Sequence, residues 1–131
     1  MRISRIIIAL SVLITVAIGG CISGGEKPPE DLLEPRENSE AGVTISATYL
    51  PDITDATAFE IKVTTHQNYD DDFKNNSYLR DSSGKTYQAL SYEGEGGHHA
   101  SGTLRFPKIE SKRFELVIQN VAGVKERVLK W

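Results

Sequence analysis

The chain has 131 residues, with 15 Lys and Arg, 18 Asp and Glu, and one cysteine. This length allows a single domain beside any targeting segment, and a lone cysteine excludes an internal disulfide. The net charge of −3 repels phosphate backbones, which argues against nucleic acid as a partner.

The first twenty residues differ in composition from the rest of the chain. Arg2 and Arg5 precede an apolar run from Ile6 to Ile18. A positive start, a short apolar stretch and small residues before a cleavage point are typical of a secretory signal. The apolar run is shorter than the ~20 residues that a membrane span needs. Residues 1–20 are therefore predicted to be a signal peptide.

The cysteine indicates the kind of signal. The segment Ile18-Gly19-Gly20-Cys21 resembles the lipobox of prokaryotic lipoproteins, which is an aliphatic residue, two small residues and Cys. The resemblance implies cleavage before Cys21, attachment of lipid such as palmitate to this residue, and anchorage at the extracytoplasmic face of the cell membrane. Acyl chains supply ~0.8 kcal/mol per buried methylene, which makes such an anchor effective. The alternative, an uncleaved apolar anchor, places the domain in the same compartment.

Residues 21–42 are predicted to form a flexible linker behind the lipidated cysteine. The segment holds three prolines and six acidic residues, and such a composition buries too little apolar surface to offset its conformational entropy. Fully extended, it would hold the domain up to about 70 Å from the lipid. Leu32 and Leu33 favour at most a short helical turn. Without the signal, 13 basic residues remain against 18 acidic ones, a net charge of −5.

From residue 43 onward the apolar residues recur with a period of two, which predicts half-buried β-strands. The predicted strands lie near residues 43–49, 59–66, 77–80, 86–92, 101–106, 114–119 and 125–131. This spacing predicts an antiparallel β-sandwich of about seven strands over residues 43–131, immunoglobulin-like in its general layout. The predicted core comprises Phe59, Ile61, Val63, Leu79, Leu104, Phe106, Phe114, Leu116, Ile118 and Leu129, with Trp131 covering one end.

Several segments of the predicted sandwich form one ordered pattern. They are Phe59-Glu-Ile-Lys-Val-Thr-Thr-His66, Leu79-x-Asp81-x-x-Gly84-x-x-Tyr87, Gly96-Gly97-His98-His99-x-x-Gly102-x-Leu104-x-Phe106-Pro107, and Gly123-Val124-x-Glu126-Arg127-x-x-x-Trp131. The pattern resembles an uncharacterised prokaryotic extracytoplasmic domain, in which a tryptophan is common where this chain has Tyr92. The resemblance implies a β-sandwich fold and an exported location, and it implies no activity.

The three histidines suggest a metal site. His66 has the polar parity of its strand, and His99 has the polar parity of the strand that follows it, whereas His98 has the core parity. His66, His99 and a carboxylate from the Asp70–Asp72 run are therefore candidate ligands for Cu(II) or Zn(II), which imidazole suits. His98 can join His99 on the same ion only if both lie in the loop. The alternative is that one histidine forms a buried hydrogen bond and the others are solvated.

The loop from Asn68 to Asn76 allows two further interpretations. Asp70, Asp71 and Asp72 offer the oxygen ligands that calcium takes. Their spacing does not match an EF-hand, so a solvated acidic loop is the preferred interpretation. Asn75 begins an Asn-Asn-Ser sequence, which has the form of a glycosylation acceptor.

Support for catalysis is thin. Lipidation would consume the only thiol, and no serine lies in a Gly-x-Ser-x-Gly elbow. Glu93 and Glu95 flank a glycine in a flexible loop, which is a poor place to hold two carboxylates at a fixed separation. Arg127 and Trp131 lie four residues apart on one strand face, where the guanidinium could stack on the ring in a structural role.

The leading functional hypothesis is a lipid-anchored, non-enzymatic module that binds an envelope protein or a cell-wall component, or supports an envelope assembly. The alternative is an extracytoplasmic Cu(II)- or Zn(II)-binding protein that uses His66 and His99. A hydrolase comes third.

Overall fold

The computed structural model describes residues 30–131, so the predicted signal peptide and Cys21 lie outside the described residues. The elements in chain order are η1 (Glu30–Leu33), β1 (Arg36–Glu40), β2 (Val43–Tyr49), β3 (Thr57–Thr65), α1 (Phe73–Asn76), β4 (Ser77–Asp81), β5 (Thr86–Gln88), β6 (Ser91–Gly94), β7 (Ser101–Phe106), β8 (Phe114–Val121) and β9 (Val124–Lys130). None of the described helices is both long and apolar enough to cross a membrane.

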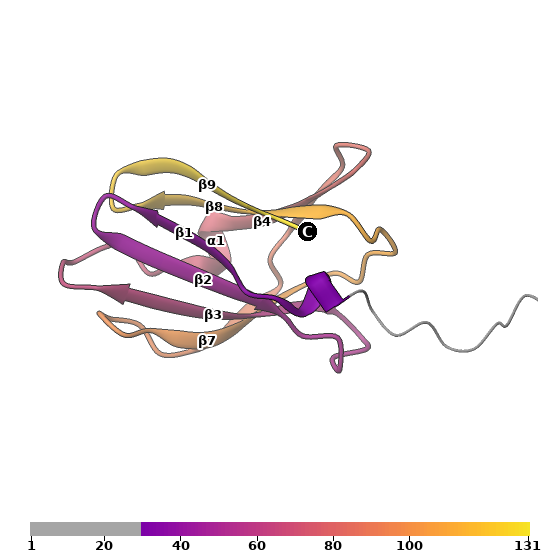
Figure 1. Ribbon diagram of the computed structural model, residues 1–131, viewed down its shortest axis with the longest axis horizontal. Helices are drawn as coiled ribbons and strands as arrows, with labels where there is room; N and C mark the ends of the chain where they lie inside the picture. The colour runs from indigo at the N-terminus through magenta and orange to yellow at the C-terminus, as the bar shows by residue number, and fades with distance from the viewer. Residues whose placement is uncertain (1–29) are drawn as a thin grey trace, which may run out of the picture.

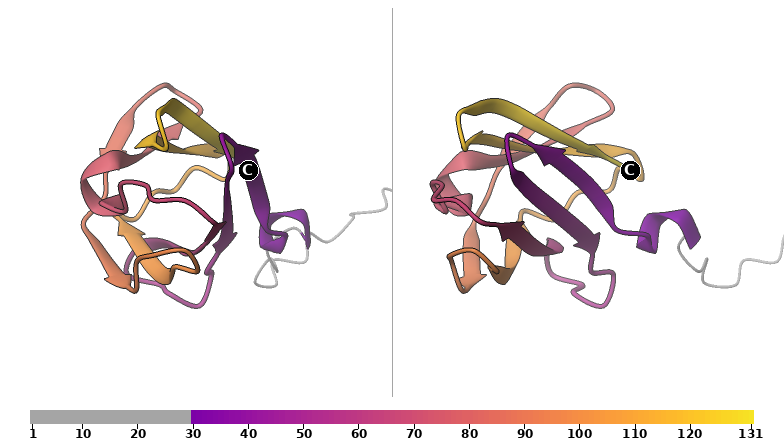
Figure 2. Two further views of the ribbon diagram at one scale, coloured as in Figure 1. Left: turned by 90° about the vertical axis from the view of Figure 1, so that its left-hand side faces the viewer. Right: turned by 60° about the vertical axis from the view of Figure 1, so that its left-hand side comes forward.

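The strands form two antiparallel sheets that pack face to face (Figures 1 and 2). The first sheet has the order β1-β2-β3-β7-β6 and the second has the order β5-β4-β8-β9. The predicted antiparallel β-sandwich is therefore confirmed, with nine strands in the described residues where the pattern predicted about seven.

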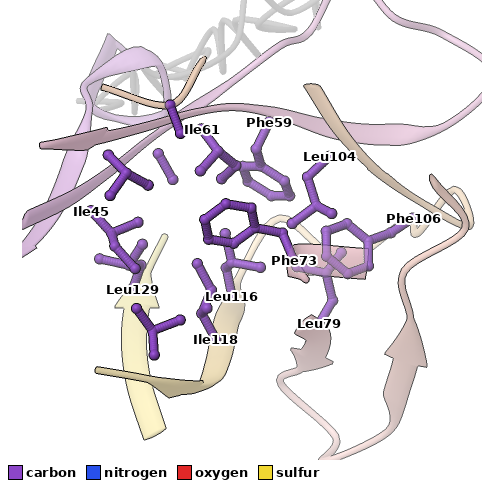
Figure 3. Packing of buried hydrophobic residues seen from close by; sticks show 14 of the residues in the cluster. Ile45, Phe59, Ile61, Phe73, Leu79, Leu104, Phe106, Leu116, Ile118 and Leu129 are labelled. Carbon is purple, nitrogen blue, oxygen red and sulfur yellow. The ribbon is translucent and has the colours of Figure 1, made fainter. Parts of the chain in front are cut away.

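The ten residues predicted for the core are all buried, and side chains of both sheets fill the space between the layers (Figure 3). Phe73 from α1 joins them with no exposed surface, although its segment was interpreted as a polar loop. Its burial follows from the single helical turn, which directs one apolar side chain inward while its polar neighbours face solvent.

The strand predicted over residues 86–92 is two strands in different sheets. β5 pairs with β4 and β6 pairs with β7, and the chain crosses between them at Ala89 and Leu90. The amide of Ala89 donates to the carbonyl of Ser77 (3.4 Å), and the amide of Leu90 donates to that of Arg105 (2.7 Å). This crossing closes one side of the sandwich.

The structure also changes the predicted domain boundary, because part of the expected linker belongs to the sandwich. Residues 36–40 form β1, which pairs with β2 from Arg36↔Ala47 to Glu40↔Val43. All five β1 residues are polar or charged, so they lack the apolar alternation from which strands were predicted. A strand at the edge of a sheet needs backbone partners more than apolar side chains, and charges suit that position.

A buried arginine joins the two sheets on the opposite side. Arg127 of β9 has no exposed surface, and its Nη2 donates to the carbonyls of Glu40 (2.8 Å) and Val121 (3.3 Å). Its Nη1 donates to Asn38 Oδ1 (2.8 Å) and to the carbonyl of Val43 (3.0 Å). Burial lowers the pKa of Arg127, and the nearby carboxylate of Glu40 opposes the shift.

Two of these carbonyl groups directly precede tight turns. Glu40 precedes Ala41-Gly42 and Val121 precedes Ala122-Gly123, and all four turn residues have positive φ, between 51° and 75°. Consecutive residues with positive φ define the turn that matches the twist of a two-stranded hairpin. Arg127 therefore ties the β1–β2 hairpin to the β8–β9 hairpin at their turns.

The expected stacking of Arg127 on Trp131 is replaced by a different pair. Arg36 lies over the Trp131 ring, 5.8 Å from its centroid. Its Nε donates to the carbonyl of Lys130 (2.8 Å), which links β1 to β9 a second time. The alternation of side chains along β9 determines on which face of the sheet Arg127 lies. The groups that Arg127 contacts there depend on the position of β1.

The sandwich has two different ends (Figure 1). The histidine end comprises the turns Ala41–Gly42 and Ala122–Gly123 together with residues 66–72 and 95–100. The Trp131 end comprises η1, Trp131 and the loops 50–56 and 107–113. The strand directions account for this division. β3 ends at the histidine end, where Thr65 pairs with Val43, and β8 begins at the Trp131 end, where Phe114 pairs with Asp81.

We expect Arg127→Ala to lower the free energy of unfolding by at least about 3 kcal/mol, because several buried acceptors lose their donor at once. Urea denaturation measures the loss. Lys125→Ala, at an exposed position of the same strand, is the matched control and should change stability by no more than about 0.5 kcal/mol. A cost below about 1 kcal/mol for Arg127→Ala would contradict the role assigned to this residue.

Candidate functional site

The histidine end brings together the two segments that contain every candidate ligand predicted from the sequence within the described residues. The β3–β7 pairing continues past the strands: the amide of Val63 donates to the carbonyl of Ala100 (2.9 Å), and the amide of Thr65 donates to that of His98 (3.0 Å). These bonds hold the loop after β3 against the loop before β7.

All three histidines are exposed. His66 directly follows β3, and His98 and His99 lie in a turn after Gly97, whose φ is +93°. The core parity predicted for His98 is wrong, because β7 begins only at Ser101 and His98 lies in the turn before it, where the alternation of the strand does not apply. The rings of the described histidines form no hydrogen bond, so no hydroxyl nucleophile is paired with a histidine here.

The acidic loop uses two of its three carboxylates locally. Asp70 Oδ1 accepts from the amide of Asp72 (3.1 Å), and Asp70 Oδ2 accepts from Asn76 Nδ2 (3.2 Å). Asp72 caps α1 by accepting from the amide (3.3 Å) and the side chain (2.7 Å) of Asn75. The two bonds from backbone amides are the contacts that Asp favours at turns and helix starts.

These contacts bear on the predicted modification and metal sites. Asn75 is exposed, as a glycosylation acceptor must be, and its amide group is held by Asp72; its glycosylation stays a prediction. Residues 30–131 contain no group of three His, Cys, Asp or Glu side chains arranged to hold a metal ion. The Cu(II) or Zn(II) site at His66, His98, His99 and Asp70–Asp72 therefore stays a prediction without a preformed ligand group.

Aromatic residues pack against the loops of the histidine end on the side that faces the core. The ring of buried Phe73 lies 6.3 Å from that of Tyr69 and 5.1 Å from that of Tyr92. The Tyr69 hydroxyl donates to the carbonyl of Gly97 (2.7 Å), and the Tyr92 hydroxyl donates to that of Glu95 (3.0 Å). Two hydroxyl groups thus fix the backbone of the Gly-rich loop on either side of Gly96.

Two glycines allow this close packing. A Cβ on Gly102 would lie 2.6 Å from atoms of the Tyr92 ring, and a Cβ on Gly96 would meet the Asp71 carboxylate. The glycines in this region therefore serve close approach of neighbouring chain segments. They place Asp71 against the loop that contains His98 and His99.

The electrostatics of the site centre on Asp71. Burial, then the negative charge of Asp71, then Tyr92 raise the pKa of Tyr69 to about 12. Burial and Asp71 also raise the pKa of Tyr92. A phenol that is desolvated beside a carboxylate resists ionisation, so both hydroxyls stay protonated and remain donors.

Sequence reasoning found the exposed polar residues of this end and missed its aromatic support. The rings of Tyr69 and Phe73 lie 6.3 Å apart, but Tyr69 precedes α1, so no helical spacing in the sequence indicates this contact. Tyr92 was noted only as a departure from the resembling domain's tryptophan.

Comparison of the chain with protein-family models, with curated proteins and with solved structures gave no match.

We expect a spectrophotometric titration of tyrosinate to show one group ionising near pH 12, and Tyr69→Phe to remove it. In the unfolded chain Tyr69 ionises near 10, so the unfolded state releases its proton first. Stability should therefore fall as pH rises from about 10 towards 12, and the fall should be smaller in Tyr69→Phe. Tyr78→Phe is the control, and equal alkaline behaviour of the two variants would contradict the assignment.

Proposed function

We propose that the chain is a lipid-anchored, extracytoplasmic module without enzymatic activity that binds a partner of the cell envelope through its histidine end. The observation that supports this most directly is the position of that end, opposite η1, from which the chain leads back to Cys21. Loops positioned by a rigid scaffold are the usual place for binding residues.

The distance between anchor and domain supports the same arrangement. Residues 22–29 lie between Cys21 and η1, and the nine residue steps from Cys21 to Glu30 span at most about 30 Å. A lipidated Cys21 would keep the Trp131 end near the membrane. The histidine end lies one strand length further out, about 30 Å for a nine-residue strand such as β3.

The chemistry of the exposed surface indicates the kind of contact. Among the described residues, the large hydrophobic side chains that are exposed are Leu33 and Leu90, and neither lies at the histidine end. The loops of this end contain the exposed carboxylates of Asp70, Asp71, Asp72 and Glu95, and no lysine or arginine. A polar and mostly acidic surface suits reversible contact with a basic partner rather than a permanent apolar interface.

A photo-crosslinking experiment in intact cells tests the binding role. We expect benzoylphenylalanine at His99 to give a discrete adduct with an envelope component, and the same group at Thr54 on the Trp131 end to give none. Asp72→Lys combined with Glu95→Lys should weaken the adduct by reversing charge, whereas Glu110→Lys should not. Recovery of the free monomer alone, or equal adducts at both ends, would contradict the proposal.

The anchor is tested separately by Cys21→Ser. We expect this variant to leave the membrane fraction, because without acyl chains the module has no apolar anchor in the bilayer. Fractionation with detection of the sandwich domain measures the change. Retention of the variant in the membrane would contradict lipid anchorage and favour an uncleaved apolar anchor.

A further inference from the structure

Two hollows flank Trp131 at the end away from the histidines, and the proposed function does not use them. The larger has a volume of about 360 Å³ and lies beside Arg80, Ser82, Phe114, Glu115 and Lys130. The smaller, of about 290 Å³, lies between η1 and the loop before β8. Arg113 and Trp131 line both hollows.

The aromatic wall of these hollows is rigid. The Trp131 ring stacks on Phe114 with centroids 5.5 Å apart and an interplanar angle of 26°. The two residues also pair through their backbones, with the Trp131 amide donating to the Phe114 carbonyl (3.0 Å) and the reverse bond at 3.3 Å. A wall fixed in this way offers a preformed surface to a ligand.

Most charged groups of the larger hollow are already paired. Glu115 accepts from Arg80 Nε (2.7 Å) and lies 3.4 Å from Lys130 Nζ. Asp81 accepts from the Ser83 hydroxyl, from the Tyr87 hydroxyl (3.0 Å), and from the amides of Ser83 (2.9 Å) and Lys85 (3.1 Å). These contacts occupy both carboxylates of the hollow and lower their pKa values.

Arg113 is the exception. It is exposed, and its guanidinium group makes no hydrogen bond or ion pair among the described residues. Arg36, by contrast, donates to the carbonyls of Lys130, Asp31 and Glu34. The charged side chains that line the larger hollow are three basic ones, Arg80, Arg113 and Lys130, and two acidic ones, Asp81 and Glu115.

We propose that the larger hollow binds a phosphate group, held by the Arg113 guanidinium, with the Lys130 ammonium and the Ser82 hydroxyl beside it. A guanidinium group matches phosphate geometry with two parallel N–H donors. Because the larger hollow is open to solvent, it can take a phosphate group that is part of a larger molecule. The source of the phosphate, a lipid headgroup or a soluble phosphate compound, follows from the test.

The lipid source rests on the proposed function, because a nine-residue tether would keep this end within about 30 Å of the headgroups. Tryptophan and arginine are also residues that suit the interface between headgroups and water. The soluble source requires no anchor, so a phosphate titration in solution is independent of whether Cys21 is lipidated.

The chain contains a single tryptophan, and it lines the hollow, so its fluorescence reports binding there. The full chain in neutral detergent micelles is titrated with inorganic phosphate at constant ionic strength. We expect a saturable change in Trp131 emission, at least tenfold weaker affinity in Arg113→Gln, and an intermediate affinity in Arg113→Lys. Lys125→Gln, at an exposed position near the opposite end of β9, should bind as the unmodified chain does.

A second arm distinguishes the sources by placing the chain in nanodiscs of phosphatidylglycerol or of phosphatidylcholine. An Arg113-dependent emission change in the anionic discs that exceeds the change in solution identifies the headgroup, and a response confined to inorganic phosphate identifies a soluble compound. Either result supports the phosphate site. No response in both arms, or a response that Arg113→Gln leaves unchanged, overturns it, and neither outcome affects the crosslinking test at His99.

Discussion

The buried guanidinium of Arg127 is the interaction on which the rest of the architecture depends. Apolar packing between two sheets is non-directional, so it leaves their relative register weakly defined. Arg127 adds direction, because its Nη2 group bonds at once to the carbonyl before the β1–β2 turn and to the carbonyl before the β8–β9 turn. Its Nε has no hydrogen-bond partner in the part of the chain that the structure describes, so contacts there do not fully compensate the burial of this charge. We infer that the residue contributes specificity of assembly in addition to stability.

Contacts between the two sheets join the sandwich along both of its sides. Arg127 and Arg36 join β1 to β9 on one side, and the crossing at Ala89 and Leu90 joins β5 to β6 on the other. The ends then differ in chemistry. One has exposed histidines and carboxylates beside two tyrosines. The other has a stacked tryptophan beside Arg113, whose guanidinium group has no partner within residues 30–131. A chain tethered through η1 would hold these ends at different distances from its membrane.

Strands with one buried apolar face could be predicted from the sequence. A strand held mainly by backbone hydrogen bonds could not. β2, β3 and β8 alternate visibly because each has one apolar face against the core. β1 has no such face, since its contacts are backbone pairing with β2 and carbonyl groups offered to Arg127. Gly97 has a left-handed conformation, and its carbonyl accepts a hydrogen bond from the hydroxyl of Tyr69, 28 residues away. Contacts of this kind arise between distant segments, so a local pattern does not contain them.

The candidate site was predictable in location but not in the roles of its residues. A polar loop between apolar strands indicates where side chains are exposed, and His66, Asp70 and His99 were found on that basis. Their neighbours determine what each side chain is free to do: Asp70 and Asp72 are engaged by α1, whereas Asp71 faces two tyrosines. Tyr69 and Tyr92 bond to loop carbonyls and not to loop side chains. The aromatic layer therefore orders the backbone while leaving the histidine rings available for contact, which is the arrangement expected of a binding surface on a fixed scaffold.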